Sequence, residues 1–138
     1  MIMLLAPRRT KFRKMQKSRI GGPIGNLEQP AFGMFALQSL ETGRIPAACL
    51  EASRRVLSRC FRRSAQIWIR CFPDKVQTKK PLEVRMGKGK GSPHNWVAVV
   101  RPGQILFEIA GATRAQVLRA RRLVSVRIPV AIRVFENM

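Results

Sequence analysis

The stretch Trp96-Val97-Ala98-Val99-Val100-Arg101-Pro102-Gly103-Gln104-Ile105-Leu106-Phe107-Glu108-Ile109 decides the fold class. Two apolar runs, rich in residues that favour strands, flank four residues that carry Pro and Gly at usual turn positions. The pattern predicts strands at residues 96–100 and 105–109, joined as a β-hairpin.

Two helices are predicted on either side of this region. Pro46 suits the first position of a helix that continues to about residue 63. Its apolar stripe is formed by Leu50, Ser53, Leu57, Cys60 and Phe61. The second helix begins at Thr113, because Gln116 three residues later completes a capping box, and it ends before Pro129.

Further strands are expected within residues 32–40, 67–72 and 130–135. Strands paired locally, with helices between them, predict an α+β fold: an antiparallel or mixed β-sheet with two helices packed on one face. The length of 138 residues allows one compact domain, placed at residues 31–138, after a tail at residues 1–30.

The predicted tail is strongly basic. Its first part contains seven cations and no acid, namely Arg8, Arg9, Lys11, Arg13, Lys14, Lys17 and Arg19. A cluster of Gly, Pro and Asn follows at residues 20–26. A segment of this composition cannot bury enough apolar surface to order itself, so an extended tail that takes its shape from a partner is expected.

The charge of the whole chain identifies the kind of partner. The net charge is +20, from 27 Lys and Arg against 7 Asp and Glu. Self-repulsion at this level destabilises a compact state unless counter-charge is supplied, and nucleic acid backbones supply it most densely. Arginine outnumbers lysine by 19 to 8, and its planar fork binds phosphate and stacks on bases.

Arginines also form a stripe on the first predicted helix. Arg55, Arg59, Arg62 and Arg63 are spaced i, i+4, i+7 and i+8. An ordinary solvated face would mix charges of both signs, and here only Glu51 does so. Contact with nucleic acid is therefore favoured over a solvated face.

Glycine and lysine alternate between two predicted strands, in a loop at residues 80–93. The loop lacks the Walker A sequence, because Gly91 follows Lys90, and Ser92 replaces the third glycine of the dinucleotide fingerprint. A nucleotide-dependent enzyme is therefore disfavoured. The loop is predicted to protrude as a flexible finger whose backbone can approach phosphates closely, with a disordered surface loop as the alternative.

The sequence does not support a metal site, a disulfide, a catalytic site or a membrane span. Cys49, Cys60 and Cys71 lack zinc-ligand spacing, and His94 is the only histidine, so neither a metal site nor any cofactor is expected. The odd cysteine count favours reduced thiols. The carboxylates form no obvious catalytic pair, which predicts that the protein is not an enzyme. No apolar run reaches the roughly eighteen residues of a membrane span, so no membrane partner is expected.

Several long strings resemble the bacterial L-sixteen ribosomal proteins, and they occur in the right order. They are Arg9-Thr10-Lys11-Phe12-Arg13-Lys14, Phe32-Gly33, Leu50-Glu51-Ala52-Ser53-Arg54-Arg55, Ile67-Trp68-Ile69-Arg70-Cys71-Phe72-Pro73-Asp74-Lys75, Arg85-Met86-Gly87-Lys88-Gly89-Lys90-Gly91 and Trp96-Val97-Ala98-Val99-Val100-Arg101-Pro102-Gly103.

The resemblance implies a structural constituent of the large ribosomal subunit that binds large-subunit rRNA, contacts neighbouring ribosomal proteins and helps to position A-site tRNA near the peptidyl-transferase centre. The rRNA contacts would come from the tail cations named above and from Arg54, Arg55, Arg59, Arg62, Arg63 and Arg70. The tRNA-proximal loop would be Arg85, Met86, Gly87, Lys88, Gly89, Lys90 and Gly91.

The C-terminal third departs from the family, since it is unusually rich in arginine. This indicates an organellar ribosome, mitochondrial before chloroplast, with the bacterial cytoplasm as the alternative. A free-standing RNA-binding chaperone or regulator, using the same cations without a fixed site, is the competing function.

Overall fold

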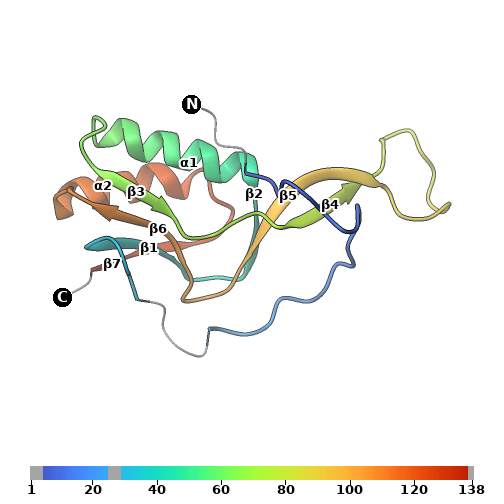
Figure 1. Ribbon diagram of the computed structural model, residues 1–138, viewed down its shortest axis with the longest axis horizontal. Coiled ribbons are helices and arrows are strands. Elements are labelled where there is room, and N and C mark those ends of the chain that lie inside the picture. Colours follow the sequence, from blue (N-terminus) through green and yellow to red (C-terminus); the bar gives the residue numbers. More distant parts are fainter. Residues whose placement is uncertain (1–4, 25–28, 137–138) are drawn as a thin grey trace.

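The computed structural model describes residues 5–24 and 29–136; residues 1–4 and 25–28 of the predicted tail lie outside this range. The described residues form two helices and two sheets, and Figure 1 shows the tail running along the outside of the domain. In chain order the elements of the described residues are β1 (Phe35–Ser39), β2 (Gly43–Pro46), α1 (Ala47–Cys60), β3 (Gln66–Ile69), β4 (Lys75–Lys79), β5 (Ser92–Val100), β6 (Ile105–Ala110), α2 (Arg114–Ser125) and β7 (Ile132–Glu136).

The α+β prediction is confirmed, but the strands form two sheets where one was expected. The larger sheet has the order β3-β6-β1-β7 and the smaller one β2-β5-β4. Every pairing is antiparallel. Both helices lie on one side of the larger sheet (Figure 1), and α1 also contacts β2 and β5 of the smaller sheet.

The predicted hairpin at residues 96–109 is wrong, because β5 and β6 belong to different sheets. The turn itself forms, since the Gln104 amide donates to the Arg101 carbonyl at 3.2 Å. Ser39, at the end of β1, then exchanges backbone hydrogen bonds with Gly103 and Gln104 at 2.8 and 2.9 Å. These bonds direct β6 onto β1, and β5 pairs with β2 and β4 instead.

Helix α1 is shorter than predicted at both ends. Pro46 is its N-cap, with φ −61° and ψ 146°, one position before the first helical residue. The helix ends at Cys60, and Arg62 and Arg63 follow with φ of 52° and 65°. These two arginines therefore do not continue the helical stripe that their spacing predicted. The apolar stripe is confirmed at its buried positions Leu50, Ser53 and Leu57.

Helix α2 begins where the sequence predicts. The backbone amide of Thr113 donates to Gln116 Oε1 at 3.0 Å, and the Thr113 hydroxyl accepts from the Gln116 amide at 3.5 Å. This capping box satisfies two amides at the start of the helix. The helix buries Val117, Ala120 and Val124 against its neighbours α1 and β7.

The core lies between the helices and the larger sheet. Leu37, Leu50 and Phe107 are fully buried there. Leu5, within the predicted tail, also reaches this core and is 8% exposed. Residues 80–91 leave the far end of β4 and return into β5, as Figure 1 shows, so the loop projects from the smaller sheet, away from the core.

Candidate nucleic-acid interface

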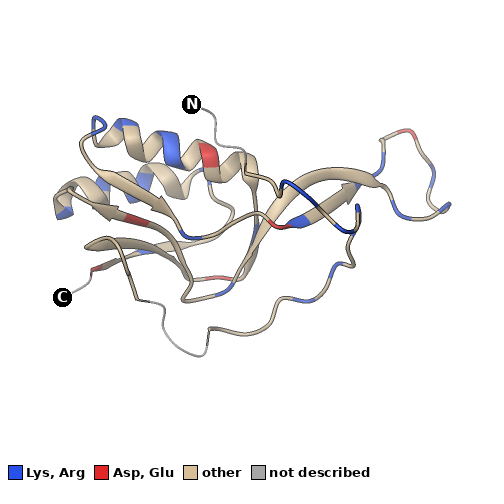
Figure 2. Ribbon diagram, in the orientation of Figure 1, with Lys and Arg blue, Asp and Glu red and all other residues tan. Residues whose placement is uncertain are grey.

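The positive charge is spread over the tail, the loop and both helices (Figure 2). Acidic partners are few among the described residues, where ion pairs involve Arg54, Arg55, Arg70, Lys75 and Arg114. The net charge of +20 is therefore largely uncompensated within the fold.

The tail cations lie on the surface, next to the smaller sheet. Residues 8–19 are all exposed. The chain is held there by backbone acceptors: Lys14 Nζ donates to the Lys90 carbonyl at 3.0 Å, and Arg44 Nη2 donates to the Ser18 carbonyl at 2.6 Å. Lys90 Nζ donates in return to the Met15 carbonyl. The tail and the loop, far apart in sequence, are thus brought together.

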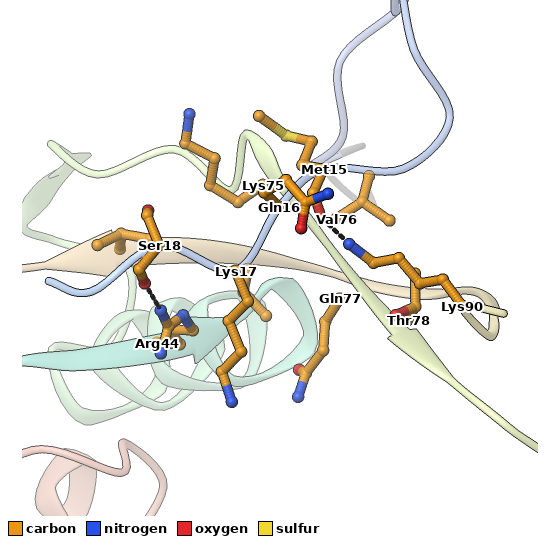
Figure 3. Close-up of a pocket in the computed structure, with 12 residues that line it drawn as sticks. Met15, Gln16, Lys17, Ser18, Arg44, Lys75, Val76, Gln77, Thr78 and Lys90 are labelled. Atoms are coloured by element: carbon orange, nitrogen blue, oxygen red, sulfur yellow. Dashed lines mark hydrogen bonds between the residues drawn. The ribbon is translucent and has the colours of Figure 1, made fainter. Parts of the chain in front are cut away.

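A cationic pocket of about 190 Å³ lies between the tail and the smaller sheet, drawn in Figure 3. Four cations from four different segments line it, and no acidic residue does. They are Lys17 of the tail, Arg44 of β2, Lys75 of β4 and Lys90 of the loop. Sequence reasoning identified Lys17 and Lys90 but gave no role to Arg44 and Lys75, which became neighbours of the tail only through the sheet.

The predicted helix arginines divide into two groups, and the first is paired within the protein. Arg54 Nε and Nη2 both donate to the Glu51 carboxylate at 2.8 Å, and Arg55 Nε donates to it at 3.0 Å. The hydrogen bond from Arg54 is the largest effect that lowers the pKa of Glu51, from 4.5 to about 2. The fork of Arg54, which could otherwise grip a phosphate in bidentate fashion, is occupied by this carboxylate.

The second group lines a groove of about 420 Å³ between the two helices. Arg59 comes from α1 and Arg62 from the residues just after it, whereas Arg119 comes from α2 and Arg127 from the residues after that helix. No acidic side chain lines this groove. Sequence reasoning left Arg119 and Arg127 without a role, although Arg119, Leu123 and Arg127 are spaced four apart, which would put them on one face of the helix predicted to end before Pro129. Arg63 does not line the groove.

Arg70 has an internal contact that its sequence position does not reveal. Its Nη1 lies 3.1 Å from Oε1 of Glu108, a carboxylate with no exposed surface. Its guanidinium carbon lies 5.2 Å from the centre of the Phe32 ring. The Arg70 side chain is therefore held by contacts with Glu108 and Phe32 inside the protein. Any contact of Arg70 with RNA would be made from this position.

The glycine-lysine loop has the exposure and backbone that its sequence predicts. Residues 81–90 are all exposed, and the Met86 side chain is 96% exposed. Gly87 and Gly89 have φ of 102° and 84°, a region that glycine enters freely. Lys80 Nζ donates to the Gly87 carbonyl, which closes the loop on itself. Its cations Arg85 and Lys88 thus stand on a backbone open to solvent.

The described residues contain no group of three His, Cys, Asp or Glu side chains placed to hold a metal ion. Cys49, Cys60 and Cys71 form no disulfide bond among the described residues. Neither helix of the described chain has both the length and the apolar character needed to cross a membrane.

Comparison with known proteins gives the family. A family model described as "Ribosomal protein L16p/L10e" matches residues 7–135. The chain is 53% identical over 130 residues to "Large ribosomal subunit protein uL16" of Dehalococcoides mccartyi, covering 94% of this chain and 87% of that protein. It is 51% identical over 128 residues to the protein of the same name in Blochmanniella pennsylvanica, covering 93% and 95%. For Buchnera aphidicola the identity is 47% over 127 residues, covering 92% and 93%. The chain therefore belongs to the L16p/L10e family of ribosomal proteins.

Proposed function

We propose that this chain binds large-subunit rRNA through its tail and its helix arginines, and that its glycine-lysine loop helps to position A-site tRNA. Membership of a large-subunit family supports a structural role in that particle. In this proposal the protein performs no chemical reaction of its own. Its partners would be rRNA, A-site tRNA and neighbouring large-subunit proteins.

One observation carries the proposal: two cation-lined surfaces in the described part of the chain contain no acidic side chain. The pocket under the tail and the groove between the helices each gather four cations. A solvated surface would gain from mixing in acidic residues, whereas a phosphate backbone supplies the missing counter-charge from outside.

The loop is proposed to face tRNA because Arg85 and Lys88 make no ion pair with the described residues, even though Glu83 lies on the same loop, and because its glycines leave the backbone open. Compact RNA surfaces can approach such a backbone closely, and the amides between the glycines can then donate to phosphate or sugar oxygens. The resemblance implies a position for this loop near the peptidyl-transferase centre, and the exposure of residues 81–90 supports that proposal.

The named relatives come from bacteria, which does not favour the mitochondrial ribosome that the arginine-rich C-terminal third indicated. We therefore propose a ribosomal location without assigning an organelle.

Salt titration of rRNA binding tests the proposal. If about eight phosphates are neutralised, affinity should fall roughly 10³- to 10⁵-fold between 50 and 200 mM salt. A flat response would contradict it. Co-sedimentation then separates the competing function, since a ribosomal protein stays with the large particle through a moderate-salt wash, whereas a free-standing chaperone is released.

A further inference from the structure

A large aromatic ring is held on the surface of the molecule. Phe32 is 60% exposed, although it precedes β1 by only a few residues. Its ring lies 5.8 Å from that of Trp68, at an interplanar angle of 26°, so the two rings are stacked. The Arg70 guanidinium lies 5.2 Å from the same ring. Most of the Phe32 surface nevertheless remains open to solvent.

A buried carboxylate fixes the backbone beneath this ring. Glu108 Oε2 accepts from the backbone amides of Ala31, Phe32 and Gly33, at 3.1, 2.6 and 3.0 Å. Three amides converging on one oxygen form a strong, directional anchor. The other oxygen, Oε1, makes no hydrogen bond but faces Arg70 at 3.1 Å. One carboxylate therefore orients both the segment that carries Phe32 and the cation beside its ring.

Gly33 shows how tightly this segment is pressed against β6. A Cβ atom at this position would lie 2.7 Å from the carbonyl oxygen of Ile109 and 2.8 Å from its amide nitrogen. Real Cβ atoms essentially never approach backbone so closely, so only glycine allows the segment to lie flat here. The segment that carries the exposed ring is thus held in place by three amide hydrogen bonds to Glu108 and by the close approach of Gly33 to β6.

This arrangement is not one that would maximise the stability of the folded protein. Burying a carboxylate carries a large desolvation penalty, and leaving an aromatic ring in water forgoes the gain from burying it. A rigid ring with an open surface, beside an arginine, is what binds unpaired nucleobases: every base has a π-face, and stacking on an aromatic ring needs no particular sequence.

We infer that the open surface of Phe32 stacks on an unpaired nucleobase, with Arg70 and Glu108 as positioning residues. The inference rests on the proposed rRNA binding and adds a base-contacting site to the phosphate-contacting surfaces. An RNA base is the favoured occupant over an apolar pocket on a protein, because the ring is next to a guanidinium in a chain of charge +20.

The test compares Phe32→Leu with Phe32→Trp in the full chain, by measuring affinity for a protein-free large-subunit rRNA transcript between 50 and 200 mM salt. Leucine keeps an apolar side chain but removes the π-face. We expect Phe32→Leu to weaken binding about 5- to 100-fold at every salt concentration, with the salt slope unchanged, because no charge is lost. Phe32→Trp should bind at least as tightly as the wild type. Equal thermal unfolding of the three proteins controls for folding.

Each outcome decides a different point. If Phe32→Leu binds like the wild type while both show the steep salt dependence, the rRNA-binding proposal stands and the stacking site is wrong. A flat salt response of the wild type overturns the proposed function, and the stacking site with it. If the Phe32→Leu defect appears only in reconstituted subunits and never on bare RNA, the ring docks on a protein, and stacking is again wrong.

Ultraviolet cross-linking gives an independent readout. Irradiation of the wild-type complex should yield a peptide containing Phe32 attached to a nucleotide outside any RNA duplex, and Phe32→Leu should abolish this product. A Phe32 adduct mapped to a paired base would contradict the inference, as would a complex whose adducts arise only at other residues.

Discussion

Lys14 Nζ donates to the backbone carbonyl of Lys90 at 3.0 Å, across 76 residues of chain. The reverse contact, from Lys90 Nζ to the Met15 carbonyl, makes the link reciprocal. Two cations lie side by side here because each is directed at a carbonyl oxygen, which offsets part of their repulsion. The tail therefore holds the base of the loop, and RNA that binds the tail would also restrain the loop.

Replacing Lys14 by Met should loosen the base of the loop. An exposed hydrogen bond of this kind contributes about 0.5–1.5 kcal/mol, so we expect amide exchange at the end of the β4–β5 ladder to accelerate about 2- to 10-fold. The relevant amides flank the pair Lys79 and Ser92. Lys17→Met is the matched control, because Lys17 makes no hydrogen bond to the described loop. Identical exchange in both variants would show that the tail does not restrain the loop.

Arg85→Ala combined with Lys88→Ala should impair tRNA accommodation several-fold while leaving subunit assembly nearly unchanged. Both side chains lie on the exposed loop, outside the core, so the fold should not depend on them. The reciprocal variant, Arg8→Ala with Arg9→Ala, should affect assembly first. The measurements are the accommodation rate on purified ribosomes and the fraction of protein in the large particle. Equal loss of both activities in the loop variant would make the loop an assembly anchor.

The sequence predicts those parts of the fold that local interactions determine. The capping box of Thr113 and Gln116 places the start of α2 correctly, because both partners lie within one turn. The sheet topology was not predictable in this way. The choice between a β5–β6 hairpin and two sheets depends on Ser39, whose bonds to Gly103 and Gln104 join residues far apart in sequence. β4 was missed because its sequence, Lys-Val-Gln-Thr-Lys, is mostly polar and is stabilised by pairing with β5.

The same limit applies to the candidate site. Charge density along the chain points to the tail, the loop and α1, and the structure finds exposed cations on each. Charge density along the chain cannot indicate which arginines are already paired with a carboxylate of the protein. Glu51 lies one turn from Arg54, so that pair was within reach of sequence reasoning, whereas Glu108 meets Arg70 only through the pairing of β3 with β6.

Thr113→Ala should lower the free energy of unfolding by about 1 kcal/mol. The substitution removes the hydroxyl that accepts from the Gln116 amide and leaves an amide at the helix start without its partner. Urea unfolding monitored by circular dichroism measures the change. Thr113→Ser, which restores the acceptor, should recover most of the loss; a serine variant as unstable as the alanine variant would show that the methyl group, and not the cap, is responsible.

Glu51 should make stability depend on pH in the acid range. Its pKa is lowered from 4.5 to about 2, chiefly by the hydrogen bond from Arg54, so the ionised form is favoured by folding. Its contribution is present above pH 4.5 and is lost as the pH falls towards 2. The Glu51 side chain is 12% exposed but that of Arg55 is 53% exposed, so screening limits the effect to roughly 1–2 kcal/mol.

The difference in unfolding free energy between the wild type and Glu51→Gln isolates this contribution, since the other carboxylates titrate equally in both proteins. The difference should be constant above pH 4.5 and shrink between pH 4.5 and 2. A constant difference down to pH 2 would mean that the Glu51 carboxylate does not stabilise the helix through its charge.

Arg119→Gln with Arg127→Gln should weaken rRNA binding in a strongly salt-dependent way. Both arginines line the groove between α1 and α2, where no acidic side chain balances them, so each is expected to neutralise a phosphate. Each lost phosphate contact reduces the steepness of the slope of log affinity against log salt by about 0.9, which predicts a slope shallower by about 1–2.

The control removes the same charge from arginines that already face a carboxylate, Arg54→Gln with Arg114→Gln. Its slope should stay closer to that of the wild type, because each of those cations already faces a carboxylate of the protein. Equal slopes for the two double variants would show that RNA senses only the total charge, and that the groove is not a binding site.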